Sequence, residues 1–148
     1  MLQETLLELF EREMDKLASE INRYADENML WSVGGGISNS AGNLCLHLLG
    51  NLNHFVGATL GKTGYVRNRD SEFSSTGVSR QDLLASVEKT KTAVLETLRN
   101  LPDERFEENF PVEKHDKTVK TDFMLIHLLT HFSYHLGQIN YHRRLIEK

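Results

Sequence analysis

Apolar residues recur every three or four positions in several separate stretches of the chain. The first stretch, residues 2–28, carries Leu2, Leu6, Leu9, Phe10, Met14, Leu17, Ile21 and Tyr24, with mostly charged residues between them. This spacing is typical of an amphipathic helix that buries one face. Three consecutive glycines, residues 34–36, then interrupt the pattern, and we expect the helix to have ended before them.

Three further stretches are predicted to be helical. They run from Asn39 or Ser40 to about Leu60, from Ser79 to Leu101, and from Thr121 or Asp122 to the C-terminus. Residues 61–78 are predicted as a long irregular connection, and residues 103–118 as a polar loop with at most a short extended piece around Asn109–Val112. Four long helices without a convincing strand predict an all-α fold, a four-helix bundle with a long connection between helices two and three. No second domain is visible, so residues 1–148 are expected to form one domain.

Composition and charge indicate a globular protein and argue against some classes of binding partner. The 148 residues are 39% hydrophobic and 26% charged, which is typical of a globular chain. The net charge is −4 and no dense Lys/Arg block occurs, which argues against nucleic acid or an anionic membrane as partner. No apolar run approaches the roughly 20 residues of a membrane span. A single cysteine, Cys45, and an N-terminus unlike a signal peptide favour a cytoplasmic setting.

Histidines are concentrated in the last predicted helix, which carries His127, His131, His135 and His142. Residues four apart lie one turn apart on one helix face, so His131 and His135 can converge on one metal ion. The same spacing occurs in His-Glu-x-x-His metalloproteases, but the glutamate is absent here. His127 pairs with His131 equally well, although His127 and His135 are about 12 Å apart along the helix axis. We expect His142, and His115 in its polar loop, to be exposed.

A third ligand must come from another helix. His47, among leucines of the second helix, suits an inward position, whereas His54 lies nearer the helix end and is expected to be partly exposed. Cys45 points about 200° away from His47 around the helix. Three neutral imidazoles leave a fourth position open, as in catalytic zinc sites, and nickel fits the same ligands. The opposing hypothesis is that these histidines are hydrogen-bonded core residues without a metal.

Several motifs together resemble the DinB-like superfamily of metal-binding four-helix bundles. They are SAGNLCLHLLGNLNHF in the second helix, NRDSEF in the long connection and HLLTHFSYHLGQINYHRR in the last helix, and the resemblance covers almost the whole chain. It implies a divalent metal, zinc or nickel, bound by His47, His131 and His135. The His-x-x-x-His pair precedes Gly137-Gln138 in the family pattern, which favours His131 with His135. The resemblance also implies a homodimer.

The function implied by this resemblance is a metal-dependent reaction on a small molecule. Some members of the superfamily transfer a low-molecular-weight thiol such as bacillithiol to electrophiles, and others are hydrolases or isomerases.

Asn51, Tyr134 and Gln138 are candidates for contacts with the substrate or the ligating histidines. Arg67, Arg69, Asp70 and Glu72 are interpreted as a solvated loop with local ion pairs; contact of either arginine with substrate is the alternative. The alternative function is a non-catalytic helical stress-response module for binding or dimerisation. Metal storage or sensing is disfavoured because one three-histidine site lacks the carboxylates of di-iron bundles, and the absence of a Glu-x-x-His pair in the predicted helices disfavours di-iron chemistry.

Overall fold

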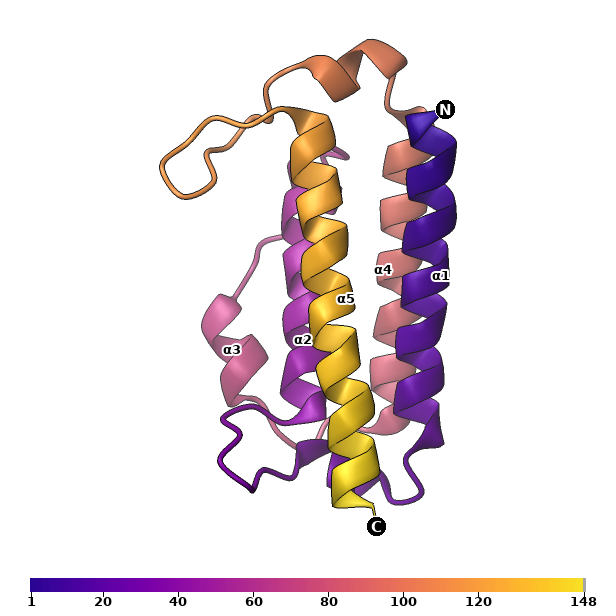
Figure 1. The fold of residues 1–148 in the computed structure, drawn as a ribbon, viewed down its shortest axis with the longest axis vertical. Coiled ribbons are helices and arrows are strands. Elements are labelled where there is room, and N and C mark those ends of the chain that lie inside the picture. The colour runs from indigo at the N-terminus through magenta and orange to yellow at the C-terminus, as the bar shows by residue number, and fades with distance from the viewer. Residues whose placement is uncertain (148) are drawn as a thin grey trace.

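The computed structural model describes residues 1–147, and these residues are predominantly helical (Figure 1). The α-helices are α1 (Leu2–Arg23), α2 (Ala41–Leu52), α3 (Arg69–Ser74), α4 (Arg80–Asn100) and α5 (Thr121–Ile146). Two 3₁₀ helices, η1 (Glu27–Trp31) and η3 (Asp103–Glu107), and a π-helix, η2 (Asn53–Ala58), complete the helical elements. Residues 1–147 contain no named strand, only isolated bridges such as Asn109 with Lys120. The all-α prediction is confirmed.

The sequence predicted four helices, and the described residues contain five α-helices. The additional one, α3, lies in the connection predicted as irregular. Its N-terminus is capped by Asn68, whose side chain accepts a hydrogen bond from the backbone N–H of Ser71. Asp70 and Glu72 place negative charge in its first turn, where it complements the helix dipole. A six-residue helix is too short to leave a 3.6-residue pattern in the sequence.

Two helix ends also differ from prediction. The chain leaves the α conformation at Tyr24 rather than near residue 28, and Asp26 then caps the separate 3₁₀ turn η1. The helix expected to reach Leu60 is regular only to Leu52 and continues as the π-helix η2. A π-helix forms i to i+5 hydrogen bonds, as in the bond from Thr59 N to His54 O of 3.0 Å. Such segments are rare and often lie near functional sites.

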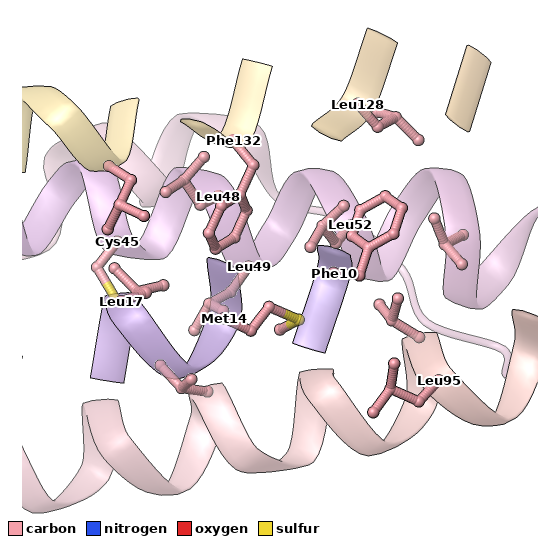
Figure 2. Packing of buried hydrophobic residues seen from close by; sticks show 14 of the residues in the cluster. Phe10, Met14, Leu17, Cys45, Leu48, Leu49, Leu52, Leu95, Leu128 and Phe132 are labelled. Carbon is pink, nitrogen blue, oxygen red and sulfur yellow. The ribbon is translucent and has the colours of Figure 1, made fainter. Parts of the chain in front are cut away.

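The hydrophobic core lies between the long helices. Helix α1 packs against α4 and α5, and α2 packs against α5 and α4 (Figure 1). The apolar face predicted for the first helix supplies Phe10, Met14 and Leu17 to a core that also contains Leu48 and Leu52 of α2 and Phe132 of α5, with Phe10 beside Leu52 (Figure 2). Full burial of each such side chain contributes about 1.5–3 kcal/mol. No helix within residues 1–147 has the length and apolarity that a membrane crossing needs.

Hydrogen bonds join the C-terminal end of α5 to α1 and to the segment that follows α1. Glu20 accepts hydrogen bonds from Asn140 (2.8 Å) and Arg143 (2.9 Å). His142, expected to be exposed, is only 6% exposed. Its Nδ1 lies 2.7 Å from the Tyr24 hydroxyl, and its Nε2 donates to the Ser32 carbonyl at 2.8 Å. The prediction of exposure was wrong because these contacts join residues more than 100 positions apart.

Candidate metal centre

The structure brings together three of the seven histidines, one from α2 and two from α5. His47, His131 and His135 each offer a ring nitrogen within 4.8 Å of those of the other two. His131 and His135 share one face of α5 because they are four residues apart. His47 comes from the facing helix α2 and is buried, whereas the other two are half-buried. The cluster therefore has one buried side, towards α2, and a side nearer to solvent.

A buried ion pair between Glu72 and Arg67 contacts the ring of His47 at its Nδ1 atom. His47 Nδ1 lies 3.0 Å from Oε1 of Glu72, a residue of α3 that is 5% exposed. Arg67 binds the same carboxylate through two contacts, Nε to Oε2 at 2.9 Å and Nη2 to Oε1 at 3.0 Å. Both oxygens of this carboxylate accept hydrogen bonds from Arg67, and Oε1 also accepts one from Nδ1 of His47. The lone pair of His47 is thereby placed on Nε2.

The local sequence makes room for this carboxylate. A β-carbon at Gly50 of α2 would lie within 2.5 Å of the carboxylate carbon of Glu72, closer than any side chain permits. Glycine at this position therefore allows α3 to bring Glu72 against α2, three residues after His47. The sequence indicated Glu72 as part of a solvated loop. The Arg67–Glu72 ion pair exists, but it is buried and directed at a histidine.

Ring nitrogens of His47 and His131 face each other at the centre of the cluster. His47 Nε2 and His131 Nε2 are 3.1 Å apart. His135 Nδ1 lies 2.7 Å from Oε1 of Gln138, one turn further along α5, and a donated proton on Nδ1 leaves Nε2 of His135 free. The orientation of two of the three rings is thus fixed by a hydrogen bond on the far nitrogen. Ligating histidines in proteins are commonly held in this way.

Burial favours the neutral form of His47 and His131. It lowers the pKa of His47, although the hydrogen bond from Nδ1 to Glu72 acts in the opposite direction. Burial, followed by the neighbouring rings of His135 and His47, lowers the pKa of His131 to about 4. A neutral imidazole has a lone pair, and only that form binds a metal ion. Near pH 7 both rings are therefore in the ligating form.

The donor set fits a divalent ion. Two nitrogens bound to one zinc ion, each about 2.0–2.1 Å from it, lie about 3.4 Å apart in a tetrahedral site. The 3.1 Å separation of His47 Nε2 and His131 Nε2 is close to that value. In addition, Nδ1 of His131 is buried without a hydrogen-bond partner among the described residues, so polar contacts alone do not account for this ring. Three ring nitrogens converging in this way can hold a metal ion.

Aromatic side chains flank the cluster. The ring centroid of Phe73 lies 4.8 Å from that of His47, and the ring of Tyr134 lies 5.2 Å from that of His135. Tyr134 is 66% exposed, so it stands at the solvent side. Arg69 lies over the Phe73 ring at 5.2 Å. Asn51 is buried in α2, and none of the hydrogen bonds described for residues 1–147 joins its side chain to the three histidines.

The remaining candidate histidines lie outside this cluster. His54 belongs to the π-helix η2 and packs against Phe55, with ring centroids 4.7 Å apart. His127 stacks on Phe123 near the start of α5, with ring centroids 6.4 Å apart. Cys45 is fully buried in the core, and burial raises the pKa of its thiol to about 12. The geometry therefore selects His131 with His135, and not His127 with His131, as the pair that meets His47.

Comparison with known proteins identifies the family and the fold. The chain belongs to the family described as "Protein of unknown function (DUF1572)", whose model matches residues 2–148. Its structure is similar to the crystal structure of a DinB-like protein from Bacillus cereus ATCC 10987, with a TM-score of 0.76 at 17% sequence identity. The similarity covers 98% of this chain and 94% of the other. No curated protein matches the sequence. The fold is therefore DinB-like, as the sequence motifs indicated.

Proposed function

We propose that this member of the DUF1572 family binds one divalent metal ion, zinc or nickel, through His47, His131 and His135. We further propose that the centre serves a reaction on a small molecule, either transfer of a low-molecular-weight thiol to an electrophile or hydrolysis. The observation that carries this proposal is the convergence of three ring nitrogens within 4.8 Å, backed by the buried Glu72. The DinB-like fold is consistent with it.

The roles of the surrounding side chains follow from their contacts. Glu72 orients His47 and raises the basicity of its ligating nitrogen, and Gln138 does the same for His135. The positive charge of Arg67 balances the negative charge of the buried Glu72 carboxylate, so the proton stays on the histidine. A divalent ion held by three neutral imidazoles supplies Lewis-acid chemistry, because one coordination position remains for water or a thiol. Phe73 and Tyr134 limit access of water to that side.

The proposal includes the finer architecture implied by the resemblance. The long helices α1, α2, α4 and α5 form a four-helix bundle in one domain spanning residues 1–148. Helix α3 lies in the connection between α2 and α4.

A second copy of the chain covers part of α5. In support, Phe123, Ile126 and Tyr134 are 58%, 46% and 66% exposed on this helix, unusual for large apolar side chains. Light scattering on the purified protein tests the homodimer.

Metal content decides between this proposal and a non-catalytic helical module. Protein purified without an affinity tag is analysed for metals alongside His47→Ala and the double variant His131→Ala/His135→Ala. We expect about one equivalent of zinc or nickel in the parent and its loss in both variants. His127→Ala is the matched control, since it removes another histidine of α5 that lies outside the cluster. Protein that contains no metal and takes up neither added zinc nor nickel would leave the stress-response binding or dimerisation module.

A further inference from the structure

A cavity of about 610 Å³ lies between the glycine loop, the start of α2 and the C-terminal end of α5. Its walls include Gly34–Gly36, Ile37, Leu44, Gln138, Tyr141 and Leu145. Gly35 and Gly36 have positive φ angles of 59° and 83°, a conformation that favours glycine, so this wall is backbone without side chains. The volume is within the range of about 300–1,000 Å³ typical of small-molecule sites.

The cavity adjoins the three histidines without being lined by them. Gln138 belongs to its wall, and Oε1 of the same side chain accepts the hydrogen bond from His135 at 2.7 Å. On the opposite helix, Leu44 lies in the wall three residues before His47, one turn of α2 away. The cavity and the histidine cluster therefore occupy consecutive turns of the same two helices, with Gln138 between them.

The lining defines the chemistry of a ligand. Within residues 1–147, no Asp, Glu, Lys or Arg lines the cavity. His142 belongs to the wall, but both of its ring nitrogens are already bonded, one to Tyr24 and one to the Ser32 carbonyl. An ionic group placed here would lose its hydration without a charged partner, which is costly. An apolar or aromatic group would gain from contact with Ile37, Leu44, Tyr141 and Leu145.

We propose that this cavity binds the uncharged, apolar or aromatic part of a substrate whose reacting group lies at His47, His131 and His135. The inference rests on the proposed function and specifies its substrate class. Gln138 lies between the cavity and His135. Its amide can form hydrogen bonds both with His135 and with a polar atom that links the two parts of the substrate. Small hydrophilic molecules are accordingly poor substrates.

The first experiment tests the cavity without metal. Benzyl alcohol is titrated into the metal-free full-length chain while methyl NMR resonances are recorded. We expect saturable shifts for Leu44, Leu145 and Ile146, all in the cavity wall, and a loss of affinity of about tenfold in Ile37→Asp. The matched control is Val112→Asp, since Val112 is 38% exposed, similar to Ile37 at 46%, but lies outside the lining. Absence of saturable shifts at these methyls would overturn the inference.

The second experiment tests the connection to the histidine cluster. Zinc-loaded protein is titrated with imidazole and with 4-phenylimidazole, which add the same nitrogen ligand without and with an aromatic group. We expect 4-phenylimidazole to bind at least about tenfold more tightly, and Ile37→Asp to abolish that preference without changing zinc affinity. Zinc uptake with equal affinities would overturn this inference and leave the proposed function standing. If zinc does not bind, the same titration is made with nickel, and failure to bind either ion would overturn both.

Discussion

Two segments of α5 carry buried or half-buried histidines, and they differ in how the ring nitrogens are satisfied. At the C-terminal end, both nitrogens of His142 have ordinary protein partners, the Tyr24 hydroxyl and the Ser32 carbonyl. In the middle, Nε2 of His131 faces Nε2 of His47, and Nδ1 has no partner among the described residues. A ring with complete hydrogen bonds is explained by stability. Ring nitrogens that converge on one another can hold a metal ion.

The same segments differ in what surrounds the rings. The C-terminal end of α5 is tied to α1 by Glu20, Asn140 and Arg143. The middle is flanked by Phe73, Tyr134 and the cavity beside Gln138. Helix position alone does not separate the two kinds of histidine, because residues 131, 135 and 142 all lie towards one side of α5. What separates them is the set of partners that other elements supply.

The largest contrast is expected from His131→Ala. Loss of one of three ligands should reduce zinc affinity by more than about 100-fold. The free energy of unfolding of the metal-free protein should change by less than about 1 kcal/mol, because a buried nitrogen without a partner is removed as well. Calorimetric zinc titration and urea denaturation measure the two quantities. Unchanged zinc affinity would mean that His131 does not belong to the centre.

His142→Ala should show the reverse behaviour. The substitution removes the partner of the Ser32 carbonyl and the shorter of the two hydrogen bonds of the buried Tyr24 hydroxyl, which keeps only the Ile139 carbonyl at 3.4 Å. We expect the free energy of unfolding to fall by about 1–3 kcal/mol. Zinc affinity should remain within about twofold of the parent, measured under conditions where the variant is folded. A large loss of zinc affinity in a folded His142→Ala protein would remove the distinction between the two segments.

The features of the fold and of the histidine cluster that could be predicted from the sequence are those with local causes. Ser79 does cap α4, its side chain accepting from the N–H of Asp82, and α5 begins at Thr121 as expected. Helical spacing allowed His131 to pair with either His127 or His135, and the family resemblance favoured His135. His47 was indicated by its leucine-rich surroundings and by the same resemblance.

The contacts that the sequence did not reveal join distant positions. Glu72 reaches His47 across 25 residues, and Tyr24 reaches His142 across 118. Neither contact is a consequence of helix periodicity, since each depends on how separate elements pack. The only local signal for Glu72 was the motif NRDSEF, in which Asn68 begins a short helix, and that signal does not indicate which residue the carboxylate meets.

Glu72→Gln sharpens the contrast by altering the histidine cluster without removing a ligand. The amide keeps the shape of the carboxylate but loses the charge that binds Arg67 and polarises His47. We expect zinc affinity to fall by about 10–100-fold. Glu13→Gln is the matched control, because Glu13 is also a buried carboxylate but bonds Ser133 between α1 and α5. Equal effects of the two substitutions on zinc affinity would refute an orienting role for Glu72.

The smallest expected effect concerns the pH dependence of the anchored end of α5. Burial alone would raise the pKa of Glu20, but hydrogen bonds from Arg143 and Asn140 outweigh it and leave the pKa below the usual 4.5. A carboxyl whose pKa is lower in the folded protein stabilises the fold above its unfolded pKa, and this contribution disappears as pH falls through the folded value. Glu20→Gln should therefore reduce the free energy of unfolding by about 1 kcal/mol at pH 7 and progressively less below about pH 4.5. Denaturation curves of both proteins from pH 7 to pH 3 measure this difference. A difference that stays constant with pH would show that packing, and not the charge of Glu20, holds this end of α5 in place.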